Sequence, residues 1–121
     1  QNLSRAIACS SHSIKAIDWG CTLQTVAVVP QSLQYVGIRS HHVAIATASS
    51  ADNTFSCWPT SVSELPQRIT MSVKLNAPPR HMSDYHLQLE IASVSQWKSL
   101  QRCSPPWVVH IQPENLLLLR S

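Results

Sequence analysis

The stretch Arg68–Asn76, "RITMSVKLN", has the clearest two-residue period in the chain. Four apolar side chains alternate there with four polar or charged ones: Ile69, Met71, Val73 and Leu75 against Arg68, Thr70, Ser72 and Lys74. Neighbouring side chains of a strand point to opposite faces, so this alternation predicts a half-buried β-strand. Strand pairing, rather than helix packing, is therefore expected to decide the fold.

Shorter versions of this pattern occur on both sides and predict further strands at 3–9, 13–19, 22–29, 33–40, 42–48, 55–65, 85–92, 107–111 and 116–119. Pro59 interrupts one of them, which is typical of an edge strand or a bulge. Gly20 closes a turn, where it is free to adopt a positive φ. Residues 93–101 have no two-residue period, and their apolar residues fall at three-residue steps, so we expect one short helix there.

Many short strands separated by turns, together with one short helix, predict an all-β fold. The expected architecture is a small OB-like β-barrel, and a length of 121 residues favours a single domain over 1–121. The strands are too short and too often interrupted by turns for a parallel sheet with crossovers. An internal duplication is possible in outline, but no residue-level repeat establishes it.

Charged residues make up only 12% of the chain, about half the usual share, whereas hydrophobic residues make up 44%. This composition suggests that part of the surface is covered by a partner. The nine basic residues are scattered singly, so the net charge of +3 does not favour nucleic-acid binding. No apolar run reaches the length of a membrane span. The chain begins with Gln1, so we expect a piece of a longer protein or a processed product.

The four cysteines lie far apart, and no pair has the C-x-x-C spacing of a zinc knuckle or a redox pair. We expect them to be reduced and mostly buried in a cytosolic protein. The adjacent pair His41 and His42 would point to opposite faces of an extended chain, which argues against one shared metal. We therefore expect no metal site.

Catalytic motifs are missing from the sequence. There are only two glycines, which excludes a P-loop and a dinucleotide-binding loop, and there is no G-x-S-x-G stretch. No two of the six carboxylates form a recognisable pair. We therefore expect the chain not to be an enzyme.

Three stretches occur in an order that resembles a known family: "AIDWG" at 16–20, "VGIRSHH" at 36–42 and "PPWVVHIQPENLLLL" at 105–119. They are similar to the C-terminal TOBE-type domain of ATP-binding subunits of bacterial ABC importers of the molybdate, tungstate and sulfate type. The second stretch is similar to the "GIRPEH" segment of that domain, and the third to its last hairpin. The resemblance spans nearly the whole chain. The serine-rich opening of dedicated molybdate-binding barrels is missing, and "NLSRA" at 2–6 matches it only in part.

The resemblance implies a regulatory and dimerising domain that follows a nucleotide-binding domain absent from this chain. It implies a homodimer, an indirect contact with the membrane permease, no direct nucleic-acid partner and a place at the cytoplasmic face of the membrane. No cofactor is expected, although molybdate, tungstate or sulfate could be sensed. The ligand-binding candidates are Arg39, Ser40, His41, His42, Ser4 and Arg5. The interface candidates are Trp107, Val109, Ile111 and Leu117. A stand-alone oxyanion-binding or nucleic-acid-binding barrel is the alternative.

Overall fold

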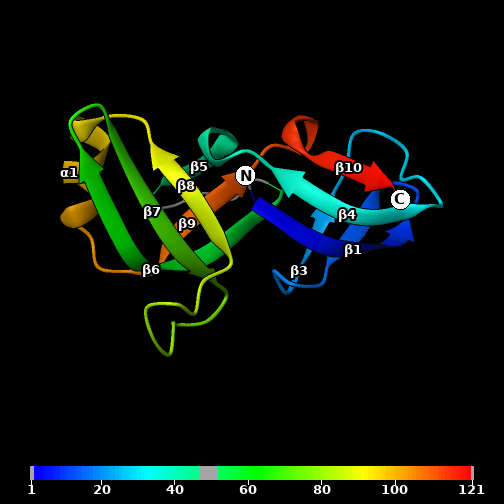
Figure 1. Cartoon of the computed structure of the whole chain (residues 1–121), viewed down its shortest axis with the longest axis horizontal. Helices are drawn as coiled ribbons and strands as arrows, with labels where there is room; N and C mark the ends of the chain where they lie inside the picture. Colours follow the sequence, from blue (N-terminus) through cyan, green and yellow to red (C-terminus); the bar gives the residue numbers. More distant parts are fainter. Residues whose placement is uncertain (1, 47–51, 121) are drawn as a thin grey trace.

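Two antiparallel sheets of five strands each lie side by side along the long axis of the molecule (Figure 1). The computed structural model describes residues 2–46 and 52–120. The first sheet has the order β10 (Leu117–Arg120), β4 (Leu33–Ile38), β1 (Asn2–Ser10), β2 (Ser13–Ala16) and β3 (Cys21–Gln24). The second has the order β5 (Val43–Ala46), β9 (Trp107–Ile111), β6 (Thr54–Leu65), β7 (Arg68–Leu75) and β8 (Leu87–Ile91).

Three helical segments accompany the strands: the α-helix α1 (Val94–Gln101) and the short 3-10 helices η1 (Ser40–His42) and η2 (Pro113–Asn115). The hydroxyl of Ser93 caps α1 by accepting a hydrogen bond from the Gln96 N–H at 3.1 Å. The prediction of a small all-β, OB-like fold with one short α-helix is thus confirmed. Within the described residues, neither α1 nor the 3-10 turns have the length and apolar character needed to cross a bilayer.

The two halves of the chain repeat one order of elements. β1, β2, β3, β4, η1 and β5 are followed by β6, β7, β8, β9, η2 and β10, with α1 added between β8 and β9. In each half the first strand pairs with the second and the fourth, and the second pairs with the third. The last strand of each half joins the other half's sheet, β5 beside β9 and β10 beside β4. The structure therefore contains an internal duplication with exchanged last strands.

This repeat is also visible in the residues of the strand–turn–strand units. "VGIRSHHVAIA" at 36–46 aligns with "VHIQPENLLLL" at 109–119. Val36 and Val109 are fully buried, and so are Ile38 and Ile111 at the next inward position. Outside these positions the two aligned stretches share no residue identity, which is why the duplication is hard to recognise from the sequence alone.

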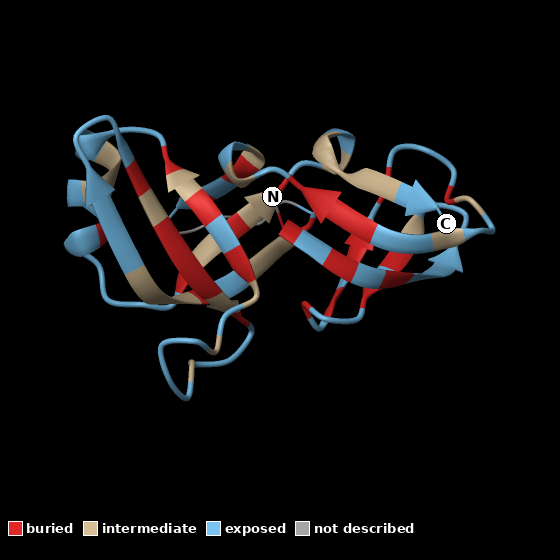
Figure 2. Ribbon diagram, in the orientation of Figure 1, coloured by how far each residue is buried: buried red, intermediate tan, exposed pale blue. Residues whose placement is uncertain are grey.

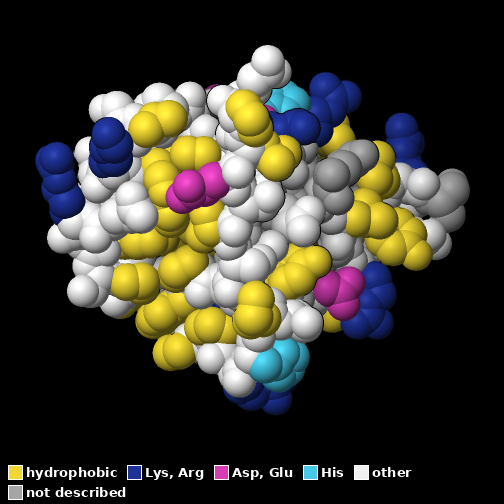
Figure 3. All heavy atoms as spheres, turned by 60° about the vertical axis from the view of Figure 1, so that its left-hand side comes forward, with side chains coloured by type: hydrophobic (Ala, Val, Ile, Leu, Met, Phe, Trp, Pro, Cys, Tyr) yellow, Lys and Arg dark blue, Asp and Glu magenta, His cyan; other side chains and the backbone are white. Residues whose placement is uncertain are grey.

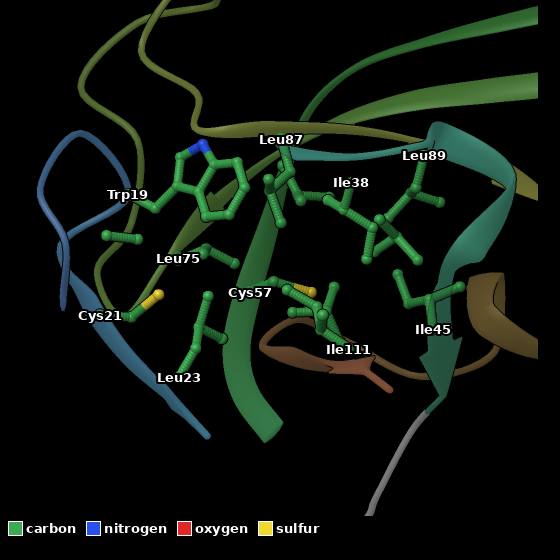
Figure 4. Close-up of a cluster of buried hydrophobic side chains, with 14 of the residues drawn as sticks. Trp19, Cys21, Leu23, Ile38, Ile45, Cys57, Leu75, Leu87, Leu89 and Ile111 are labelled. Atoms are coloured by element: carbon green, nitrogen blue, oxygen red, sulfur yellow. The ribbon is translucent and has the colours of Figure 1, made fainter. Parts of the chain in front are cut away.

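One continuous core joins the sheets, as the buried positions in Figure 2 indicate. Trp19, Leu23 and Ile38 of the first half pack in one cluster with Leu75 and Leu87 of the second (Figure 4). The apolar side of β7, which the alternation at 69–75 predicted, is part of this cluster. The face in Figure 3 carries many hydrophobic and few charged side chains, in keeping with the low share of charge.

Two asparagine side chains also link the halves. The Oδ1 of Asn53 accepts from the Gln24 N–H at 2.7 Å, and its Nδ2 donates to the Gln24 carbonyl at 3.0 Å. Asn2 makes the equivalent pair of bonds with Gln88. Each amide therefore takes the place of a neighbouring strand at the outer edge of β3 or β8, where backbone groups would otherwise lack partners.

Some strands end earlier than their patterns predicted. The strand expected at 22–29 ends at Gln24, because the backbone N–H groups of Thr25 and Val29 donate to the β1–β2 turn instead of to a strand. The strand expected at 13–19 ends at Ala16, where the turn containing Gly20, with a φ of 67°, begins. Residues 47–48 of the predicted strand 42–48 lie outside the described residues. Pro59 lies beside a bulge in β6, beyond the part of that strand that pairs with β9, so the expectation of a bulge is confirmed.

Candidate functional site

The polar stretch Arg39–His42 joins β4 to β5, and three of its residues form η1. The short 3-10 turn bends the backbone, so the rings of His41 and His42 lie next to each other with centroids 4.1 Å apart and planes inclined by 55°. The expectation that these two side chains point to opposite faces was wrong, because it assumed an extended chain at this position. The bend makes two imidazoles available at one place.

A hollow of about 290 Å³ opens beside these histidines, and we call it the histidine hollow. Its walls come from η1, β5, the end of β8, α1 and the η2 region. They are formed by His41, His42, Val43, Ala44, Ile45, Glu90, Ala92, Gln96, Gln112 and Asn115. Its polar groups are thus two imidazoles, one carboxylate and three side-chain amides, which can donate and accept hydrogen bonds.

A second hollow of about 490 Å³ adjoins the first and shares Glu90 with it. It covers the polar face of β6, β7 and β8, where the hydroxyls of Ser61, Ser63, Thr70 and Ser72 line it together with Ser40. Arg68 pairs with Glu90 across this face at 3.4 Å. Because both partners are partly exposed to solvent, this ion pair adds little stability and leaves the guanidinium accessible.

The described residues contain no group of three or more His, Cys, Asp or Glu side chains arranged to hold a metal ion. The two histidines and Glu90 line one hollow without converging on a common point. The arrangement can bind a small polar ligand or an anion through hydrogen bonds.

Ser4 and Arg5 have another role in the structure. The Ser4 hydroxyl accepts from the Asp18 N–H at 3.0 Å and donates to the Arg5 carbonyl at 2.8 Å. Arg5 pairs with Asp18 at 2.8 Å, and this hydrogen-bonded guanidinium lowers the pKa of the Asp18 carboxyl below its usual range. Both residues therefore hold the β2–β3 turn against β1. In the described part of the chain they share neither a hollow nor a hydrogen bond with η1.

The four predicted interface residues divide into two groups. Trp107, Val109 and Ile111 are buried in β9 within the chain's own core. The indole N–H of Trp107 donates to the Cys103 carbonyl at 2.9 Å. These three side chains therefore face inward and offer no outer surface. Leu117 is half-buried on the edge strand β10.

The cysteines are all free, but only two are buried. Burial raises the pKa of the Cys21 and Cys57 thiols to about 12. Cys9 and Cys103 are exposed, so the expectation of mostly buried cysteines is correct for half of them.

Sequence reasoning missed Asn2, Asn53 and Gln96, whose amides bond to the backbone of edge strands. It also missed the cluster in which Lys74 pairs with Asp84 while the His86 Nδ1 accepts from the Leu75 N–H. The sequence signals for these residues were weak, because asparagines that precede a strand and single histidines occur in many loops without a special role. These residues organise the fold and do not line the histidine hollow, apart from Gln96.

Comparison with known proteins identifies no relative. No family model matches the chain, and neither a curated protein nor a solved structure is similar to it.

Proposed function

We propose that this chain is the accessory β-barrel domain of the ATP-binding subunit of an ABC importer of the molybdate, tungstate or sulfate type. The observation that supports this best is the location of the two longest motifs that carry the resemblance. They lie in the strand–turn–strand units that cross between the sheets: residues 36–42 cover the end of β4 and η1, directly before β5, and residues 105–119 cover β9, η2 and most of β10. The motifs thus build the frame of the domain, as expected if the chain shares the architecture of that family.

In this role the domain does not hydrolyse ATP itself. It binds a nucleotide-binding domain at the cytoplasmic face of the membrane and contacts a second copy of the same subunit. The test is size-exclusion chromatography of the purified chain with a purified nucleotide-binding domain from a molybdate-type importer of the same genome. We expect the two to elute together, and the chain alone to turn over no ATP. Separate elution at 100 μM of each, or ATP turnover by the chain, would contradict the proposal.

The outer face of the first sheet is suited to a second copy of the chain. Leu3, Ile7, Tyr35 and Leu119 are exposed there, and register pairs place Tyr35 opposite Arg5 on one side and Leu119 on the other. Exposed apolar side chains grouped on one face of a sheet, here around the Arg5–Asp18 ion pair, are typical of an interaction surface. A two-fold axis lets such a face pack against its own copy.

Sedimentation equilibrium measures this self-association directly. We expect a concentration-dependent dimer that the double variant Leu3→Lys with Tyr35→Lys makes at least tenfold weaker. The matched control is Val62→Lys with Leu65→Lys, which places the same charges on exposed apolar positions of the second sheet. An equal loss of dimer in both double variants would place the interface elsewhere.

The histidine hollow is the place where an oxyanion would be sensed. His41, His42 and the side-chain amides that line the hollow can donate hydrogen bonds to an anion there, and Arg39 directly precedes η1 in the chain. Calorimetry with molybdate, tungstate and sulfate at pH 6 tests this. We expect binding that the variant His41→Gln with His42→Gln weakens at least tenfold, whereas His12→Gln in the exposed β1–β2 turn leaves it unchanged. The absence of heat for all three anions would remove the sensing role.

A further inference from the structure

The two halves differ most at one connection. The second half passes from β8 to β9 through α1, whereas the first passes from β3 to β4 through a loop at 25–32. Because the rest of the topology repeats, each part of the second sheet that contacts α1 has a counterpart in the first sheet that lacks such a helix. The first sheet therefore presents the surface that α1 contacts in the second.

In the second sheet, α1 contacts the edge strand β5 through Gln96. The Gln96 Nε2 donates to the Ile45 carbonyl at 2.8 Å, and its Oε1 accepts from the Ala92 N–H at 3.1 Å. Leu100 of the helix is only 1% exposed, so the apolar side of α1 is packed against the core. In this edge strand Val43 and Ile45 are 2% and 4% exposed and belong to the core.

In the first sheet, the equivalent edge strand is β10; Leu116, just before it, and Leu118, within it, align with Val43 and Ile45. Both leucines are only half-buried. Beside them lies an apolar hollow of about 360 Å³, which we call the β10 hollow, lined by Thr25, Val26, Ala27, Pro113, Glu114, Leu116 and Leu118. In the adjoining loop Val26 and Val28 are 64% and 67% exposed. These exposed apolar side chains point to a surface that is completed by another molecule.

The backbone of β10 is also the least protected edge. Side-chain amides bond to the outer edges of the other three edge strands, with Asn53 on β3, Asn2 on β8 and Gln96 on β5. Among the described residues, no side chain hydrogen bonds to the backbone of β10. An uncovered edge strand is a known site of association, since its free N–H and C=O groups need partners.

Charge adds a second restriction on the partner. Glu114 is the only charged residue that lines the β10 hollow, and it takes part in no ion pair within 2–46 and 52–120. A partner that covers the hollow without leaving this carboxylate unpaired needs a lysine or arginine nearby. The bulge between Leu119 and Arg120 and the short length of β10 make the edge poorly suited to a long added strand.

We propose that the β10 hollow binds an amphipathic helix of a partner protein, in the position that α1 occupies in the second half. The apolar side of that helix contacts Val26, Leu116 and Leu118. A side-chain amide of the helix donates to the carbonyl of Leu118, the counterpart of Ile45, and a basic residue pairs with Glu114. This is a helix-in-groove mode of recognition with the carbonyl of an edge strand as its polar anchor.

The test uses the whole, ¹⁵N-labelled chain and a lactam-stapled helical peptide with the sequence of residues 92–102. This peptide contains Gln96 together with two basic residues, Lys98 and Arg102. We expect amide shifts at Val26, Glu114 and Leu118 that saturate below millimolar peptide. The same peptide with Gln96→Ala should bind at least threefold more weakly. A scrambled stapled peptide of the same composition should cause no such shifts.

Variants of the chain show whether the peptide binds at the β10 hollow or non-specifically elsewhere on the surface. Val26→Glu changes an exposed loop residue, so it should leave the fold intact while it weakens peptide binding at least tenfold. Glu114→Gln should weaken binding and reduce its dependence on salt. Leu65→Glu, at an equally exposed position on the β6–β7 hairpin, is the control.

Three results would overturn the proposal. The first is a lack of shifts at 2 mM stapled peptide, and the second is unchanged affinity in Val26→Glu. The third is a concentration-dependent shift of the Val26 and Glu114 amides without peptide, which would make a second copy of the chain the occupant of the β10 hollow.

Discussion

The side-chain amide of Asn2 pairs with the backbone of Gln88 as a neighbouring strand would. Its Oδ1 accepts from the Gln88 N–H at 2.7 Å, and its Nδ2 donates to the Gln88 carbonyl at 2.8 Å and, at 3.3 Å, to the carbonyl of Ile38. Asn2 belongs to the first sheet and Gln88 to the edge of the second. One buried side chain thus connects the two sheets.

We expect Asn2→Asp to destabilise the fold. The carboxylate keeps an acceptor for the Gln88 N–H but places negative charge beside two carbonyl oxygens that have lost their donor. Leaving such buried groups unsatisfied costs about 1–3 kcal/mol of the free energy of unfolding. Urea denaturation measures this change. The control is Gln34→Glu, which makes the same amide-to-acid change at an exposed position of β4 and should alter stability by less than about 0.5 kcal/mol.

We expect the variants of Asn53 to show an unusual order of stability. Its φ is 56°, in the left-handed region that asparagine and glycine tolerate better than alanine. Both Asn53→Gly and Asn53→Ala remove the two hydrogen bonds with Gln24, but only alanine adds backbone strain. Thermal denaturation should therefore show Asn53→Ala to be less stable than Asn53→Gly by roughly 1 kcal/mol. Equal stability of the two variants would show that the backbone at this position relaxes.

The stability of the protein should fall as the pH drops through the range in which His86 titrates. Burial, followed by the charge of Lys74, lowers the pKa of His86 below its ordinary value of 6.5, while Asp84 opposes this shift. Below pH 6.5 the unfolded chain takes up this proton before the folded chain does, so the free energy of unfolding decreases with falling pH. Above pH 6.5 both states hold a neutral imidazole and the dependence ends.

Urea denaturation between pH 5 and pH 8 checks this behaviour. The variant His86→Gln should have a flatter pH dependence than the wild type over this range. The control, His12→Gln, removes an exposed histidine and should leave the slope unchanged. If His12→Gln flattened the curve as much as His86→Gln, the burial of His86 would not be its cause.

The four thiols should react in two separate phases with a disulfide reagent such as DTNB at pH 8. Cys9 and Cys103 are exposed and should react quickly. Cys21 and Cys57 are buried, with a pKa of about 12, so they hold little thiolate and should react only when the chain opens. In 8 M urea all four should react at once. A fast phase that persists in the variant Cys9→Ser with Cys103→Ser would contradict the core described above.

The positions of most strands could be predicted, because the two-residue period depends only on which side chains are buried. The strand Trp107–Ile111 has the expected bounds, and α1 begins at Val94, one residue after the start of the predicted segment 93–101. Strand ends were less predictable. β3 ends at Gln24 because the N–H groups of Thr25 and Val29 donate to the β1–β2 turn, and Asn53, far along the chain, bonds to its outer edge. No local pattern can signal such contacts.

The candidate site was predictable only in part. The polar stretch at Arg39–His42 does lie beside a hollow. The bend that brings His41 and His42 together, however, depends on the passage of the chain from β4 in the first sheet to β5 in the second. Glu90 and Gln96 reach the same hollow from distant segments. The burial of Trp107 and Val109 reflects the central place of β9, between β5 and β6, which a list of strands does not reveal.

The traded last strands have a consequence for how such a molecule could arise. A polypeptide of half this length, with the elements of β1 to β5 alone, would leave one place in its sheet empty and one strand without a neighbour. Two separate copies could remove both defects by domain swapping, in which the final strand of each copy pairs within the sheet of the other. Joining the copies in one chain keeps this exchange of strands, so that neither half can complete its own sheet without the other.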